Sequence, residues 1–79
     1  MKKIELFKLI KTALKTSAKI TEKSSSNNLE EWDSLGHLSI LTALDKKTSG
    51  KTSKIKSLAD WDTVTEIIKV LKTKKIIKD

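Results

Sequence analysis

Ser34 is the residue in this sequence best placed for covalent chemistry. It follows a polar stretch and stands at the start of a predicted helix, so its hydroxyl should be exposed and held by a rigid scaffold. The unpaired N–H groups and the positive dipole end of a helix N-terminus favour a phosphodiester at such a position. Asp33, directly before it, adds a carboxylate that could interact with a metal or a cationic partner during attachment. Serine and aspartate are also preferred N-caps, so either residue could instead serve only as a cap.

His37 lies three residues after Ser34 and suggests a Ser–His catalytic pair. A hydrolase would also need a group that orients the imidazole and an oxyanion site, and the sequence offers neither. We therefore expect a surface histidine, or one that contacts a group attached to Ser34, and we predict that the chain is not an enzyme. Because the chain has no cysteine and only this one histidine, we also predict no metal site.

Apolar residues spaced three and four apart predict three main helices. The first is expected at about residues 2–16, with an apolar stripe made by Leu6, Phe7, Ile10, Ala13 and Leu14. The second is expected from Asp33 or Ser34 to about Lys47, with a stripe made by Leu35, Leu38, Leu41 and Leu44. The last is expected after Asp62, its predicted cap, with one face made by Val64, Ile67, Ile68 and Leu71.

The segments between these helices are predicted to be a long loop and a shorter connection. Residues 23–28 are rich in serine and asparagine, which favour loops, and Ile20 and Leu29 should anchor that loop to the core. Residues 48–53 form a polar connector in which Gly50 can adopt a left-handed turn. Ile55 and Leu58 suggest a short apolar turn or helical piece. The tail, about residues 73–79, is expected to fray.

These elements predict an all-α fold: a small bundle of three main helices and one short helix, with a long first loop, in a single domain over residues 1–79. Trp32 and Trp61 are expected to be packing anchors rather than ligand platforms. The predicted core consists of Phe7, Ile10, Leu14, Leu38, Leu41, Val64, Ile67 and Leu71.

The charge is strongly basic but unevenly distributed. The formal net charge is +7, while residues 21–45 carry one lysine against five acids. All seventeen cations are lysine, which lacks the planar fork that reads bases and phosphates in bidentate fashion. We therefore expect no nucleic acid partner. The short apolar runs predict no stable membrane insertion and no signal peptide, so we expect a cytoplasmic protein.

The segment Trp32-Asp33-Ser34-Leu35-Gly36-His37-Leu38 resembles the modification segment of bacterial acyl carrier proteins. The resemblance covers almost the whole chain, because the predicted order of helices and loops is also that of the family. It implies that Ser34 carries phosphopantetheine derived from coenzyme A, and that acyl or aminoacyl groups ride on this cofactor as thioesters.

The resemblance also implies partners: a phosphopantetheinyl transferase and the enzymes that load and transfer acyl or aminoacyl groups. A carrier that must visit several enzymes is expected to be a monomer. Asp33, Leu35 and Asp45 are the residues expected to take part in partner recognition. Asp45 is the one helical acid after Ser34, whereas carriers of fatty acid biosynthesis typically have several, so the pattern favours a specialised biosynthetic pathway within lipid or related metabolism. Two alternatives stay open: an unmodified protein-interaction module of the same fold, and a basic nucleic-acid-binding helical domain.

Overall fold

The described part of the chain folds into three α-helices joined by one long loop and one shorter connection, as its apolar periodicity predicts. A computed structural model describes all residues except Lys56, Leu58 and Ala59. Its elements are α1 at Lys3–Leu14, α2 at Ser34–Lys47, the 3-10 helix η1 at Lys51–Lys54, and α3 at Val64–Thr73. Within the described residues the only β-type pairing is an isolated bridge between Ser25 and Thr63. The predicted all-α class is therefore confirmed.

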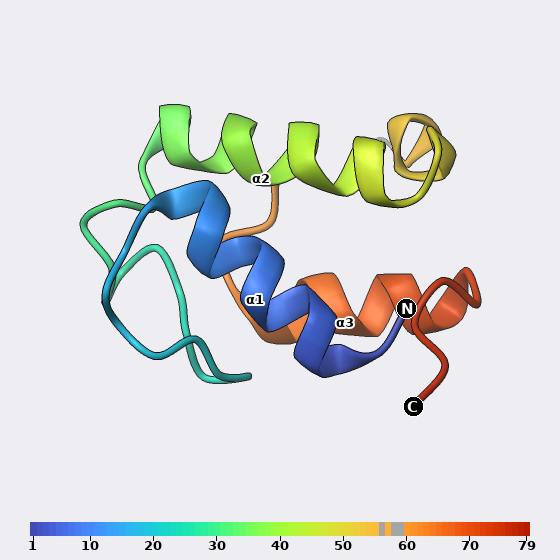
Figure 1. Cartoon of the computed structure of the whole chain (residues 1–79), viewed down its shortest axis with the longest axis horizontal. Coiled ribbons are helices and arrows are strands. Elements are labelled where there is room, and N and C mark those ends of the chain that lie inside the picture. The colour runs from blue at the N-terminus through green and yellow to red at the C-terminus, as the bar shows by residue number, and fades with distance from the viewer. Residues whose placement is uncertain (56, 58–59) are drawn as a thin grey trace.

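The helices place the start of α2 far from the chain ends. α2 lies along one edge of the molecule with α1 packed against it, and η1 follows α2 at the end remote from Ser34 (Figure 1). The two chain ends meet, because the Lys78 N–H donates to the Met1 carbonyl at 3.2 Å. No helix formed by the described part of the chain is long and apolar enough to cross a membrane.

The core lies between the three helices and includes two buried tryptophans, Trp32 and Trp61. Ile10, Leu14, Val64, Ile67 and Leu71 are buried as predicted, and so are the loop anchors Ile20 and Leu29. Phe7, predicted as a core residue, is only partly buried and packs against the edge of the core. Leu6, Leu44 and Ile68, which belong to the predicted apolar stripes, are also buried, and so are the predicted packing anchors Trp32 and Trp61. Among the described residues, the buried apolar side chains that no predicted stripe or anchor included are Ile40 and Ile77.

The predicted face of α2 is right at Leu44 and wrong toward the start of the helix. Leu35 and Leu38 are 76% and 58% exposed and Leu41 is half-buried, whereas Ile40 and Leu44 are fully buried. A spacing of three falls short of a full turn by about 60° at each step, so a stripe from residue 35 to residue 44 drifts by about 180° around the helix. The buried side follows a spacing of four through Gly36, Ile40 and Leu44.

This facing can be tested with two truncations on the same helix. Ile40→Ala should lower the free energy of unfolding by about 2–5 kcal/mol, because it leaves a cavity in the core. Leu38→Ala should change it by less than about 0.5 kcal/mol, because Leu38 is mostly in solvent. Urea unfolding followed by circular dichroism measures both. Equal losses for the two variants would contradict the facing described here.

The ends of the helices explain most of the remaining local structure. The cap of α3 is Thr63, not the predicted Asp62: the Thr63 hydroxyl accepts from the Glu66 N–H at 3.2 Å. The predicted polar connector contains the 3-10 helix η1, which begins after Gly50 at a φ of 86°. Leu58, which we predicted to belong to a short apolar piece with Ile55, lies outside the described residues.

The tail does not fray as predicted. The N–H groups of Ile76 and Ile77 both donate to the Leu71 carbonyl, at 2.8 and 3.2 Å, and Ile77 is only 2% exposed. The chain turns back on itself at Lys75, whose φ is 60°. The sequence pattern missed this because a single apolar pair after a helix carries no periodicity.

Candidate functional site

Ser34 is the first residue of α2, and its side chain is exposed. The capping role falls to Asp33, whose Oδ1 accepts from the Gly36 N–H at 2.8 Å. The sequence alone did not distinguish between Asp33 and Ser34 as the cap. Because the aspartate closes the helix, the serine hydroxyl is not needed for the cap and faces the surroundings at the positive end of the helix dipole.

Trp32 and His37 fix the loop that leads into α2. Trp32 is buried, and its indole Nε1–H donates to His37 Nδ1 at 3.0 Å. The two rings are nearly parallel, at 12°, with centroids 6.2 Å apart. Trp32 is therefore a packing anchor, as predicted. Because His37 Nδ1 accepts this hydrogen bond, that nitrogen is not available to take a proton from Ser34.

A cleft of about 470 Å³ opens beside Ser34. It is formed where the long loop and the start of α2 meet the segment that leads into α3, because the Ser26 N–H donates to the Asp62 carbonyl at 2.8 Å. The residues that line it are Ser26, Trp32, Asp33, Ser34, His37, Asp60, Trp61 and Asp62. The lining thus combines aromatic rings with three carboxylates around the one exposed serine that begins a helix.

Three of these lining residues, Asp60, Trp61 and Asp62, were not predicted as part of the site. A signal for them exists in the sequence. The segment Glu31-Trp32-Asp33-Ser34 leads into α2 and ends on its first residue, and Asp60-Trp61-Asp62-Thr63 directly precedes α3. An acid, a tryptophan, an aspartate and a hydroxyl residue therefore occur twice in the same order. The fold brings the two copies to the same cleft. The two copies differ in which residue caps the helix. The Thr63 hydroxyl caps α3, whereas Asp33, and not Ser34, caps α2.

The predicted recognition residues do not all lie together. Leu35 is exposed next to Ser34. Asp45 lies eleven residues further along α2, roughly 16 Å away at 1.5 Å per residue. It is half-buried, and its Oδ1 is buried without a hydrogen-bond partner among the residues that the structure describes. Asp45 is therefore remote from the cleft, and the acids that accompany Ser34 come from the two tryptophan segments instead.

The described residues contain no group of three or more histidine, aspartate or glutamate side chains arranged to hold a metal ion. What the site offers is therefore an exposed primary alcohol at a helix N-terminus, beside a cleft with aromatic and acidic walls. Comparison with known proteins adds no family: no family model, no curated protein and no solved structure matches the chain.

Proposed function

We propose that the chain is an acyl-carrier-type protein whose Ser34 carries a phosphopantetheine arm. The observation that carries the proposal is that Asp33 and Ser34 have different roles at the start of α2. Asp33 caps the helix, which leaves the adjacent serine exposed as its first residue. If Ser34 served only as a helix cap, its hydroxyl would accept the hydrogen bond from the Gly36 N–H that Asp33 accepts here.

The surroundings of Ser34 fit the arm. Attachment joins the serine oxygen to the phosphorus of the phosphopantetheine group of coenzyme A, releases adenosine 3′,5′-bisphosphate and frees the hydroxyl proton. The phosphodiester that results is anionic and is stabilised by the positive end of α2. The cleft beside Ser34, with Trp32 and Trp61 in its walls, has room for part of the arm.

On this proposal, other enzymes perform the reactions. A transferase attaches the arm, loading enzymes acylate its thiol, and the carrier supplies attachment and recognition. The exposed residues of α2 after Leu35 include Leu38, Ser39, Thr42, Lys46 and Lys47 and no carboxylate. A partner that docks on this helix meets an apolar and basic surface, which supports a specialised pathway over the acid-recognising enzymes of ordinary fatty acid synthesis.

The proposal is tested by intact-mass spectrometry after incubation with coenzyme A and a phosphopantetheinyl transferase of broad specificity. The expected result is the gain of one phosphopantetheine group per chain. An established carrier protein in the same reaction serves as the positive control. If the control is fully modified and this chain keeps its original mass, the chain is an unmodified interaction module and the proposal is wrong.

Leu35 provides a test of recognition beside Ser34. Leu35→Ala should slow attachment of the arm about fivefold or more, because it removes apolar surface beside the modified residue that the docked transferase would bury, at a cost of about 1 kcal/mol or more. Ile4→Ala is the matched control, since Ile4 is 57% exposed but lies on α1. Initial rates at limiting transferase measure both. A rate for Leu35→Ala equal to that of the control would remove Leu35 from the recognition surface.

A further inference from the structure

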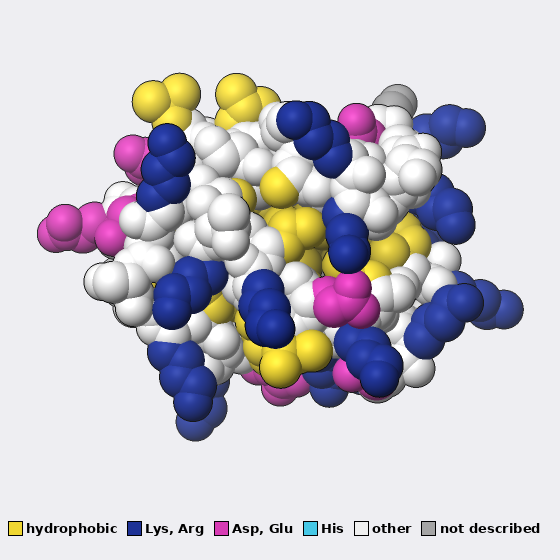
Figure 2. Space-filling view, viewed as in Figure 1, with side chains coloured by type: hydrophobic (Ala, Val, Ile, Leu, Met, Phe, Trp, Pro, Cys, Tyr) yellow, Lys and Arg dark blue, Asp and Glu magenta, His cyan; other side chains and the backbone are white. Residues whose placement is uncertain are grey.

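A second cavity lies away from Ser34, between α1 and α2. Its volume is about 680 Å³, within the roughly 300–1,000 Å³ typical of small-molecule sites. Figure 2 shows apolar side chains at the surface in the hollow between the two helices, with lysines and an acidic side chain beside them. The lining residues nearest to Ser34 in sequence are Leu38 and Ser39, about one helical turn further along α2.

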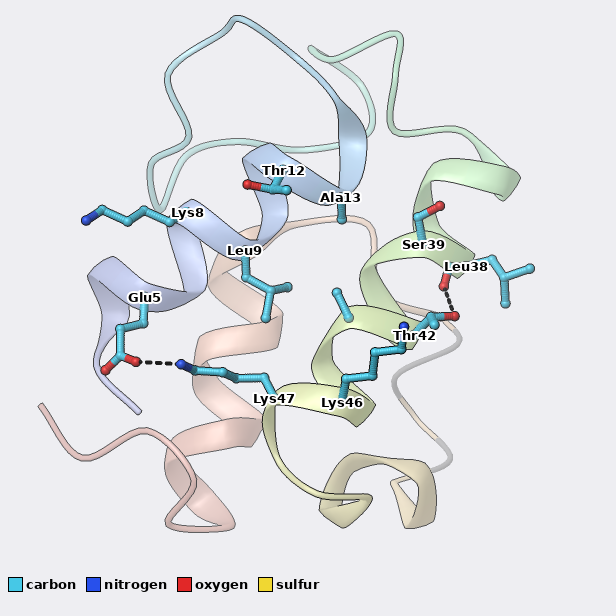
Figure 3. Close-up of a pocket in the computed structure, with 11 residues that line it drawn as sticks. Glu5, Lys8, Leu9, Thr12, Ala13, Leu38, Ser39, Thr42, Lys46 and Lys47 are labelled. Carbon is cyan, nitrogen blue, oxygen red and sulfur yellow. Dashed lines mark hydrogen bonds and ion pairs between the residues drawn. The ribbon is translucent and has the colours of Figure 1, made fainter.

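Small side chains create this groove. Ala13 on α1 and Ala43 on α2 both line it, where larger residues would fill the space between the helices. Leu9 points from α1 into the gap (Figure 3). The hydroxyls of Ser39 and Thr42 donate to carbonyls of their own helix, at 3.1 and 2.9 Å, so their hydrogens are already engaged. The lining is therefore mainly apolar.

The charged rim of the groove is positive. It contains Lys8, Lys46 and Lys47 and a single acid, Glu5. Lys47 Nζ lies 3.1 Å from Glu5 Oε2 and so ties α2 to α1 at one end of the groove (Figure 3). The Lys2 N–H, and then Lys47, lower the pKa of Glu5, which keeps this carboxylate charged and paired. Lys8 points from α1 to the side away from α2 (Figure 3), so Lys46 is the lysine of the rim that is left to complement an anion.

We infer that this groove binds a single-chain anionic amphiphile, such as a fatty acid, with its hydrocarbon against Leu9, Ala13 and Ala43 and its carboxylate near Lys46. An apolar chain gains by leaving water in proportion to its buried surface. The cationic rim selects an anionic head over a neutral or cationic one. The site is separate from the proposed arm at Ser34 and does not depend on it.

The test is isothermal titration of the unmodified protein with dodecanoate below its critical micelle concentration. We expect saturable binding at one site, and clearly weaker binding of dodecyltrimethylammonium. Ala43→Leu, which fills the groove, should weaken dodecanoate binding at least about tenfold. Lys46→Met should weaken it about threefold, as expected for one exposed ion pair. Lys69→Met on α3 and Ser34→Ala should both leave it unchanged.

Several results would overturn the inference. One is binding of the cationic amphiphile as tight as that of dodecanoate, and another is an Ala43→Leu variant that folds and still binds normally. A ligand-free dimer in sedimentation that Ala43→Leu dissociates would assign the groove to a second copy of the chain. Tighter binding of an acidic amphipathic peptide would assign it to a partner protein. Because no coenzyme A is present, none of these results depends on whether Ser34 is modified.

Discussion

Gly36→Ala is expected to destabilise the fold by at least about 3 kcal/mol, at the upper end of the range for overpacking. A Cβ at this position would lie 2.0 Å from the Glu31 carbonyl oxygen and 2.8 Å from Leu14 Cδ2. The first contact is with backbone, so no change of rotamer relieves it. A domain of this size has only about 4–12 kcal/mol of stability, and the variant should be substantially less helical at ambient temperature.

Gly50→Ala is the control for this prediction. Gly50 has a φ of 86°, but the nearest atom to an added Cβ, Asp45 Oδ1, is 3.9 Å away. The cost there is conformational alone, about 1–2 kcal/mol. Urea unfolding of the two variants separates close packing from backbone strain. If Gly36→Ala costs no more than Gly50→Ala, the loop before α2 does not lie as close to the helix as described.

Ser34→Ala should abolish the attachment of phosphopantetheine and leave the fold almost unchanged. The loss should be complete because no other hydroxyl in the described part of the chain occupies an equivalent place: Asp33 caps α2 beside Ser34, whereas the Thr63 hydroxyl is engaged with Glu66. The change in unfolding free energy should stay within about 0.5 kcal/mol, because Ser34 is exposed and Asp33 keeps the cap. Intact mass and urea unfolding of the same preparation measure the two effects.

Ser26→Ala is the matched control, since Ser26 lines the same cleft without beginning a helix. It should accept the arm at the normal extent. A Ser34→Ala variant that still gains the full mass would place the modification elsewhere. A Ser34→Ala variant that unfolds would instead show that the serine has a structural role that its exposure does not suggest.

The sequence predicted the helices well because their apolar periodicity is strong. α3 is the clearest case, since Val64, Ile67, Ile68 and Leu71 form one narrow face and all are buried. α2 shows the limit of the same method. Its leucines outnumber its other apolar residues and suggested a face on which only Leu44 is fully buried, while Gly36 and Ile40 received no weight. Only the approach of the Glu31 carbonyl makes Gly36 a packing residue, and that contact depends on tertiary structure.

The candidate site was predicted in part. Ser34 and Asp33 lie together at the start of α2 because they are adjacent in the chain. The contribution of Asp60 and Asp62 was missed because it depends on how the second tryptophan segment folds back on the long loop through Ser26. The groove between α1 and α2 was missed for a related reason: Ala13 and Ala43 create it only when they face each other across two packed helices.

The most direct test of the central claim is to locate the added group within the chain. Protein incubated with coenzyme A and the transferase is digested, and its peptides are fragmented in a mass spectrometer. The account predicts a single phosphopantetheine group, released on fragmentation as pantetheine and carried by the peptide that contains Ser34, with every other serine and threonine unmodified. A group on any other residue, or an unmodified Ser34 peptide beside a fully modified control carrier, would contradict it.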